Sequence, residues 1–281
     1  MACRRPHFNR ALLGMIAACS FAAAARAQAC PKARATRLAV IGGLYVGAEV
    51  TAIALRQDDW WTTPRTGFHV TWDQSPSAGQ DRLLHAAVGY HASQAGAAAF
   101  RWACLAPVPA AWLGLGLGLA VGLPKEIGDG WHERKGFSAP DMLWTALGST
   151  LPAAHATWPA SRAFALKVSY WPSDEYRNRT GIQPQIESDY AGQRYYLAVA
   201  PGQADSGLAW PRWLGFAVGH SVPYWASQPP VHEWYASLDL NLRGLPLRAG
   251  WWRPVAWALD QIHFPAPGVR VRDGAWTLGF F

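Results

Sequence analysis

Charged residues are scarce in this sequence. Asp, Glu, Lys and Arg make up 15% of its 281 residues, whereas soluble domains carry about 25%. Apolar residues reach 51%, and 17 of the residues are tryptophan. Amphipathic indole rings favour the boundary between membrane and water. We therefore expect a membrane or membrane-surface protein, with a Trp-rich soluble core as the alternative.

Several motifs of known chemistry are absent from the sequence. It has no phosphate-binding loop, no dinucleotide fingerprint and no Cys/His zinc cluster. It also lacks a basic patch of the kind that binds nucleic acid. The formal net charge is +7, but four arginines and no acids lie in residues 1–27, so removing that segment lowers the charge from +7 to +3. We expect no nucleic-acid partner.

Residues 1–27 have the organisation of a secretory signal peptide. Three arginines precede the apolar run 11–25, and Ala25-Arg26-Ala27 forms an A-x-A cleavage site. The small residues before Cys30 also resemble a degenerate lipoprotein box, which makes Cys30 a candidate for lipidation. We expect an exported protein of the periplasm or cell membrane in a bacterial envelope, with a membrane lipid or an envelope component as its partner.

Cysteine is also scarce, with four residues in the chain. Two of the four cysteines fall in the signal segment, which leaves Cys30 and Cys104. A disulfide between them is permitted in an oxidising compartment, although one pair in a chain of this length is not a disulfide framework.

Residues 28–163 are predicted to form a small membrane-associated helical bundle. Its helical segments are 38–55, 83–100, 103–123 and 141–157, of which 38–55 and 103–123 are apolar enough to pass as membrane spans. The second and third segments are expected to form an antiparallel hairpin that turns near Arg101-Trp102. Gly114, Gly118 and Gly122 repeat every four residues, a spacing that lets helix backbones approach closely.

The hydrophobic period changes from about residue 164, which predicts an antiparallel β-rich region over 164–281. In 234–243 the residues Trp234, Ala236, Leu238 and Leu240 alternate with polar residues such as Ser237 and Asp239. Further strands are predicted at 164–171, 195–199, 214–219 and 275–281, with a short helix at 252–262. The fold class predicted is therefore α+β.

Polar residues precede and follow the predicted hairpin in the sequence. Because an antiparallel hairpin returns the chain to the end of the bundle where it began, we expect the acids and the histidine to meet there. Asp81 and His85 lie one helical turn apart, so they share a face. They can bind a metal together, or the aspartate can orient the histidine as a general base. Asp81 is equally suited to cap a helix that begins at Arg82.

Glu126 and Asp129 lie three residues apart at the far end of the apolar run. They can complete a metal site with His85, or form a buried ion network with Lys125, Arg82 and Arg134; the ion network is the favoured interpretation. Ser138 fits a helix N-cap with Asp141 at the third position, while the catalytic interpretation makes Asp141 a second general acid or base. Whether a metal or other cofactor binds is left open.

The order and spacing of these residues resemble the YfiM-like family, a group of periplasmic lipoproteins of unknown function. The matching positions are Asp81, His85, Lys125, Glu126, Asp129, Gly136, Phe137, Ser138, Asp141 and Gly148. The segment 189–196 is similar to a segment in longer members of that family. The same order of motif residues and helices more loosely resembles VanZ-like membrane proteins. Two positions depart from the pattern: Arg82 replaces a lysine, and Thr145 replaces an acid or amide.

The resemblance implies a cell-envelope protein with a structural or interaction role, in which the polar cluster holds the helices together. The alternative is a hydrolase at the membrane surface that acts on a lipid or cell-wall precursor. Its candidate catalytic residues are Asp81, His85, Glu126, Asp129 and Asp141, with or without a divalent metal.

Overall fold

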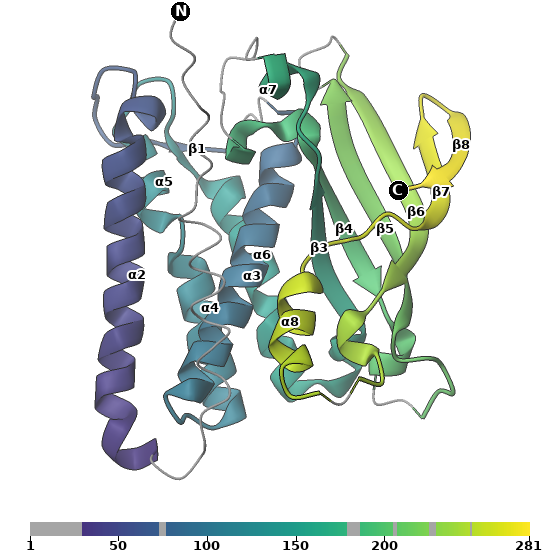
Figure 1. Ribbon diagram of the computed structural model, residues 1–281. Helices are drawn as coiled ribbons and strands as arrows, with labels where there is room; N and C mark the ends of the chain where they lie inside the picture. The colour runs from purple at the N-terminus through teal and green to yellow at the C-terminus, as the bar shows by residue number, and fades with distance from the viewer. Residues whose placement is uncertain (1–29, 73–76, 179–185, 205–206, 225–228, 248) are drawn as a thin grey trace, which may run out of the picture.

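The computed structural model describes residues 30–72, 77–178, 186–204, 207–224, 229–247 and 249–281. The predicted signal peptide, 1–27, lies outside them. The chain is an α+β protein, as predicted, with a helical part followed by a six-stranded antiparallel sheet (Figure 1). The first strand of this sheet begins at Phe164.

Within the residues that the structure describes, the helical part consists of five helices and a small two-stranded sheet. The helices are α2 (Cys30–Trp60), α3 (Gln80–Trp102), α4 (Pro107–Ala120), α5 (Leu123–Asp129) and α6 (Ala139–Thr157). Strands β1 (Val70–Thr71) and β2 (Phe137–Ser138) pair in parallel. The predicted continuous helix over 103–123 is divided, because Gly122 adopts a left-handed conformation with φ of 82° between α4 and α5.

Helix α3 packs against α4 and α6, which also contact each other, and glycines allow the close contacts. A Cβ atom placed on Gly114 would lie 2.6 Å from the backbone nitrogen of Ala97, and one on Gly118 would lie 2.7 Å from the carbonyl oxygen of Gly89. The predicted small-residue contact is therefore confirmed for these two glycines. Gly122 has no atom within 4 Å of such a Cβ, so its role is in the turn.

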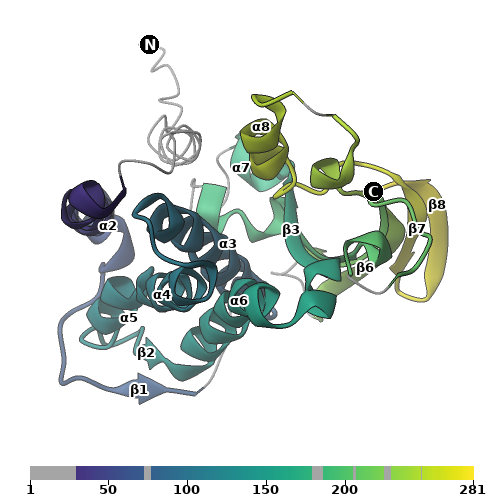
Figure 2. The same ribbon diagram turned by 90° about the horizontal axis from the view of Figure 1, so that it is seen from below.

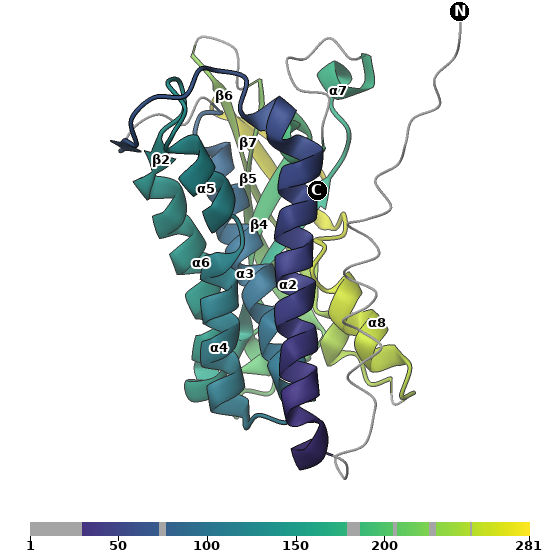
Figure 3. The ribbon, with the colours of Figure 1, turned by 90° about the vertical axis from the view of Figure 1, so that its left-hand side faces the viewer.

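Helix α2 runs along the outside of this bundle (Figures 2 and 3). The Arg37 guanidinium donates to the Trp102 carbonyl at 2.6 Å, and the Tyr45 hydroxyl donates to the Ala120 carbonyl at 2.9 Å. Two helical stretches, Ala33–Trp60 and Pro107–Asp129, are long and apolar enough to cross a membrane, and only 6% of the most apolar window in the first is buried. Apolar side chains of α2 thus face outward along most of its length.

The large sheet is an antiparallel meander whose strands follow one another in chain order. They are β3 (Phe164–Tyr170), β4 (Gln193–Val199), β5 (Leu214–Tyr224), β6 (Val231–Leu240), β7 (Pro267–Arg272) and β8 (Ala275–Phe280). The sequence did not predict β7, which opens with Pro267 and Gly268. Helix α8 (Trp252–Leu259) occupies the predicted position, and the chain after it pairs Ile262 with Val168 at the β3 edge.

The buried face of this sheet is the polar one. Along β6, Glu233, Tyr235, Ser237 and Asp239 are buried, while the alternating residues, among them Trp234, are exposed. The register continues the same division across the neighbouring strands. Leu197, Val218, Ala236, Val269 and Leu278 form one outward row, and Lys167, Tyr196, Gly219, Tyr235 and Arg270 form an inward row. Antiparallel sheets of soluble proteins normally show the opposite arrangement.

Candidate functional site

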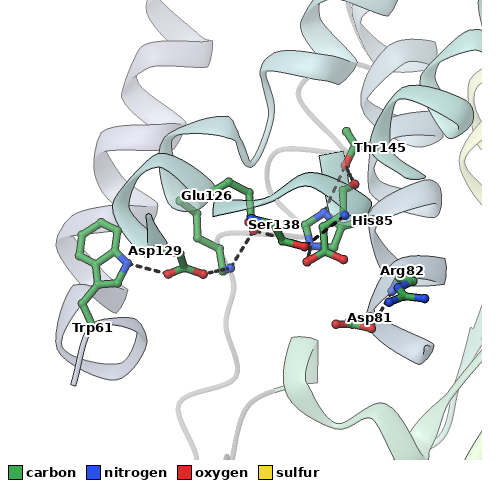
Figure 4. A network of polar contacts seen from close by, with 10 residues as sticks. Trp61, Asp81, Arg82, His85, Glu126, Asp129, Ser138 and Thr145 are labelled. Atoms are coloured by element: carbon green, nitrogen blue, oxygen red, sulfur yellow. Dashed lines mark hydrogen bonds and ion pairs between the residues drawn. The ribbon is translucent and has the colours of Figure 1, made fainter. Parts of the chain in front are cut away.

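Three helices converge on one end of the bundle and bring most of the candidate residues together (Figure 4). Helix α3 supplies His85, α5 supplies Glu126 and α6 supplies Asp141. One ligand atom from each of these three residues lies within 4.8 Å of the other two. This agrees with the expectation that an antiparallel hairpin returns the chain to the end where it began.

The Glu126 carboxylate is buried and has defined partners on both oxygens. Its Oε1 accepts from Lys125 Nζ at 3.0 Å, and its Oε2 accepts from the backbone N–H of Ser138 at 3.2 Å. The β1–β2 pairing, which includes Ser138, holds that N–H in place. Glu126 is therefore fixed in orientation, and its charge is partly neutralised by Lys125.

Asp129 belongs to the same ion network but faces away from His85. Its Oδ2 accepts from Lys125 Nζ at 2.7 Å, and its Oδ1 accepts from Trp61 Nε1 at 2.8 Å. The Trp61 ring also stacks on the His132 imidazole at 5.5 Å between centroids. Asp129 thus connects α5 to the chain that leaves α2, and the geometry gives it a structural contact rather than a place beside the histidine.

Asp141 combines a capping position with a place in the cluster. Ser138 is the N-cap of α6, and its hydroxyl accepts from the Asp141 backbone N–H at 3.3 Å, which confirms the predicted cap. Burial raises the pKa of the Asp141 carboxyl, and the nearby His85 opposes that rise. The charges of Asp81 and Glu126 add to the increase, so four carboxylates influence this end of the bundle.

Thr145 fixes the proton of the His85 ring. The Thr145 hydroxyl donates its only proton to the Asp141 carbonyl at 2.9 Å. It can therefore only accept from His85 Nδ1, which lies 3.2 Å away. In the neutral ring Nε2 then carries the lone pair, and it faces Asp141 Oδ2 at 3.8 Å and Glu126 Oε1 at 3.9 Å.

Asp81 lies on the far side of His85 and does not cap the helix. Helix α3 begins at Gln80 and its N-cap is Gly79, so the predicted cap at Asp81 is wrong. The reason is local: Gly79 adopts a left-handed conformation with φ of 89°, which starts the helix earlier. The Asp81 carboxylate accepts instead from the Arg82 backbone N–H at 2.9 Å.

The turn that precedes β4 contributes a tyrosine to the neighbourhood of this cluster. Tyr190 belongs to the segment 189–196 that the sequence singled out. Burial raises its pKa to about 12, and the carboxylates of Asp81, Asp141 and Glu126 contribute to the increase. The side chain of Gln80 also donates to the Gln193 carbonyl at 2.8 Å. The segment therefore links the sheet to the polar end of the bundle.

A second ion network, which the sequence did not predict, lies on the inner face of the sheet. The Lys167 ammonium lies 2.9 Å from Asp239 Oδ2 and 3.1 Å from Asp260 Oδ1. His263 Nδ1 lies 2.8 Å from Asp239 Oδ1, and its Nε2 lies 3.2 Å from Ser237 Oγ. The aspartate in the middle of the β6 alternation was the one signal available in the sequence.

The series of contacts from Asp239 through His263 to Ser237 resembles a hydrolytic triad, but the surroundings of these residues indicate a structural role. All three side chains are buried, and His263 Nε2 also lies 3.0 Å from the Phe281 carbonyl oxygen. A cavity of about 90 Å³ adjoins the Lys167 side of the network, between bundle and sheet. Neither the His263 imidazole nor Ser237 lines it.

Cys104 is disulfide-bonded, as the sequence allows. The side chain of Cys30, its predicted partner, lies outside the described side chains. Lipidation of Cys30 likewise stays a prediction.

No family model matches the chain, and no curated protein or solved structure matches it either. The YfiM-like and VanZ-like resemblances therefore remain predictions that rest on the motif residues alone.

Proposed function

We propose that this chain is an exported, membrane-associated protein of the bacterial envelope, of the YfiM-like kind, with a structural or interaction role. Membrane lipid is its expected partner. In this proposal the polar cluster holds α3, α5 and α6 together at one end, while apolar surfaces of the helices and the sheet contact lipid.

The reversed sheet is the observation that carries the proposal. Burying charged side chains is costly unless they are paired, and here Lys167 and Glu233 are paired inside the sheet. Apolar side chains meanwhile form continuous outward rows. Strands in contact with lipid show this alternation, apolar outward and polar inward. The exposed apolar face of α2 supports the same environment.

Three leucine or valine side chains of equal exposure test lipid contact. Val218 on the sheet is 59% exposed, Leu44 on α2 is 60% exposed, and Leu208 in a loop is 58% exposed. We expect Val218→Lys and Leu44→Lys to lower the fraction of protein that remains in membranes after alkaline carbonate extraction. Leu208→Lys is the control and should leave that fraction unchanged. If all three variants behave like the wild type, the lipid-contact proposal is wrong.

A membrane-surface hydrolase is the second candidate, because the Nε2 lone pair of His85 lies beside Asp141 in a partly exposed position. A general base needs such an available lone pair. The substrates to test are phosphodiester- and acyl-ester-bearing lipids in mixed micelles. A catalytic role predicts that His85→Gln abolishes hydrolysis without loss of stability, whereas a structural role predicts a lower unfolding temperature and no hydrolysis by the wild type.

A further inference from the structure

The side chains of His85, Glu126 and Asp141 enclose a position that suits a cation. Their ligand atoms are an imidazole nitrogen and two carboxylate oxygens, all within 4.8 Å of one another. When His85 is neutral, no positive charge lies between the two carboxylates that face its Nε2, and they repel one another unless a cation binds there. Lys125 supplies charge on one side only, since it contacts Glu126 and Asp129.

We propose that these three residues form a binding site for one divalent transition-metal ion, such as Zn²⁺ or Mn²⁺. The inference goes beyond the structural role proposed above and does not depend on it. One imidazole and two carboxylates are ligands that such ions accept.

The distances favour a metal over a direct hydrogen bond. His85 Nε2 lies 3.9 Å from Glu126 Oε1 and 3.8 Å from Asp141 Oδ2, which is too long for a hydrogen bond. Ligand atoms around a tetrahedral Zn²⁺ with bonds of about 2.1 Å lie ~3.4 Å apart. The two distances from His85 Nε2 exceed this separation by about half an ångström, and the two carboxylate oxygens lie within 4.8 Å of one another, so side-chain adjustment would close the site.

Each ligand is already oriented by a neighbour, as in established metal sites. The Thr145 hydroxyl accepts from His85 Nδ1 and so directs the Nε2 lone pair inward. Lys125 and the Ser138 N–H hold Glu126. His85 and Asp141 are partly exposed while Glu126 is buried, so an ion can enter from solvent and keep water as a further ligand.

The test is equilibrium binding of Zn²⁺ and of Mn²⁺ to the full-length mature protein in detergent, after chelator treatment. We expect one ion per chain with micromolar affinity or better, and at least a 100-fold loss in His85→Gln and in Asp141→Asn. Asp129→Asn is the matched control, because Asp129 shares the Lys125 network but not the site; its affinity should stay within about threefold. Thr145→Val should weaken binding by about 10- to 100-fold.

Two results would overturn the inference: no saturable binding of either ion by the wild type, or binding that persists in both ligand variants. Circular dichroism identifies any variant that does not fold. In that case X-ray absorption of the Zn²⁺-loaded wild type decides, since it should show one imidazole ligand and oxygen ligands. Ligation by two or more imidazoles, or by none, would contradict the assignment.

Discussion

Trp234 and Asp239 lie on opposite faces of strand β6, and it is the tryptophan that faces outward. Trp234 is 54% exposed and Asp239 is 1% exposed. The aspartate is stabilised by Lys167 and His263, which hold the pKa of its carboxyl below the ordinary value although burial alone would raise it. The sheet can bury charge because each charge has a partner there.

The inner network of the sheet predicts a large effect of Lys167→Met. This change leaves Asp239 and Asp260 in the interior without their cation, and removing one partner of a buried ion pair costs about 3–5 kcal/mol. Urea unfolding followed by circular dichroism measures the loss. Lys135→Met, at an exposed position, serves as the control. A loss below about 1 kcal/mol would show that the network is not coupled to folding.

The cluster at the end of the bundle predicts a smaller effect of Glu126→Gln. The substitution removes the negative charge that pairs with Lys125, whose side chain is 31% exposed. We therefore expect the free energy of unfolding to fall by about 1–3 kcal/mol rather than by the full cost of breaking a buried pair. Glu133→Gln, in an exposed segment near the same site, should be neutral. Thermal unfolding in detergent compares the two variants, and equal midpoints would argue against a structural role for Glu126.

Helix contact in the bundle is tested by two glycines of α4. Gly114→Ala places a methyl group 2.6 Å from α3 backbone atoms, and such overpacking costs about 1–3 kcal/mol. Gly116 has nothing within 4 Å of an added Cβ, so Gly116→Ala should be neutral or should stabilise the helix by up to about 1 kcal/mol. The unfolding midpoint of Gly114→Ala should fall, whereas that of Gly116→Ala should stay unchanged or rise. Identical behaviour would mean that α3 and α4 are not in close contact.

His91 predicts a pH dependence of stability. Its Nδ1 donates to Gln261 Oε1 at 2.7 Å, across the boundary between bundle and sheet, and burial lowers its pKa from 6.5 to about 4. Between these values the unfolded chain binds more protons than the folded one, so stability falls as the pH decreases from 6.5 to 4. Because the ring is only partly shielded from solvent, we expect His91 to contribute about 1–2 kcal/mol to this fall.

The measurement is the urea midpoint of the wild type and of His91→Gln at pH 7 and pH 5. The variant should lose less stability on acidification, because glutamine does not titrate. If His91→Gln loses as much stability on acidification as the wild type does, the pH dependence comes from other groups. One such group is His155, whose pKa is also lowered to about 4 by burial.

Much of the candidate site followed from local pattern. Ser138 and Asp141 have the spacing of an N-cap and its third residue, and both occupy those positions. Asp81 failed as a cap because Gly79 starts the helix earlier, and no spacing rule reveals which of two neighbouring starts is used. Thr145 was visible only as a departure from a motif, yet it orients His85, because its place next to the ring depends on how α6 packs against α3.

The sequence alone determined the type and approximate extent of most helices and strands, and it determined which residues share a face, since periodicity is a local property of the backbone. It could not determine which face of the sheet lies inside, because burial depends on what the other elements and the surroundings offer to each face. Nor could it separate Glu126, which meets His85, from Asp129, which meets Trp61. The two carboxylates share a short helix, and only the packing of that helix, with Trp61 beside Asp129 and His85 of α3 beside Glu126, assigns them different partners.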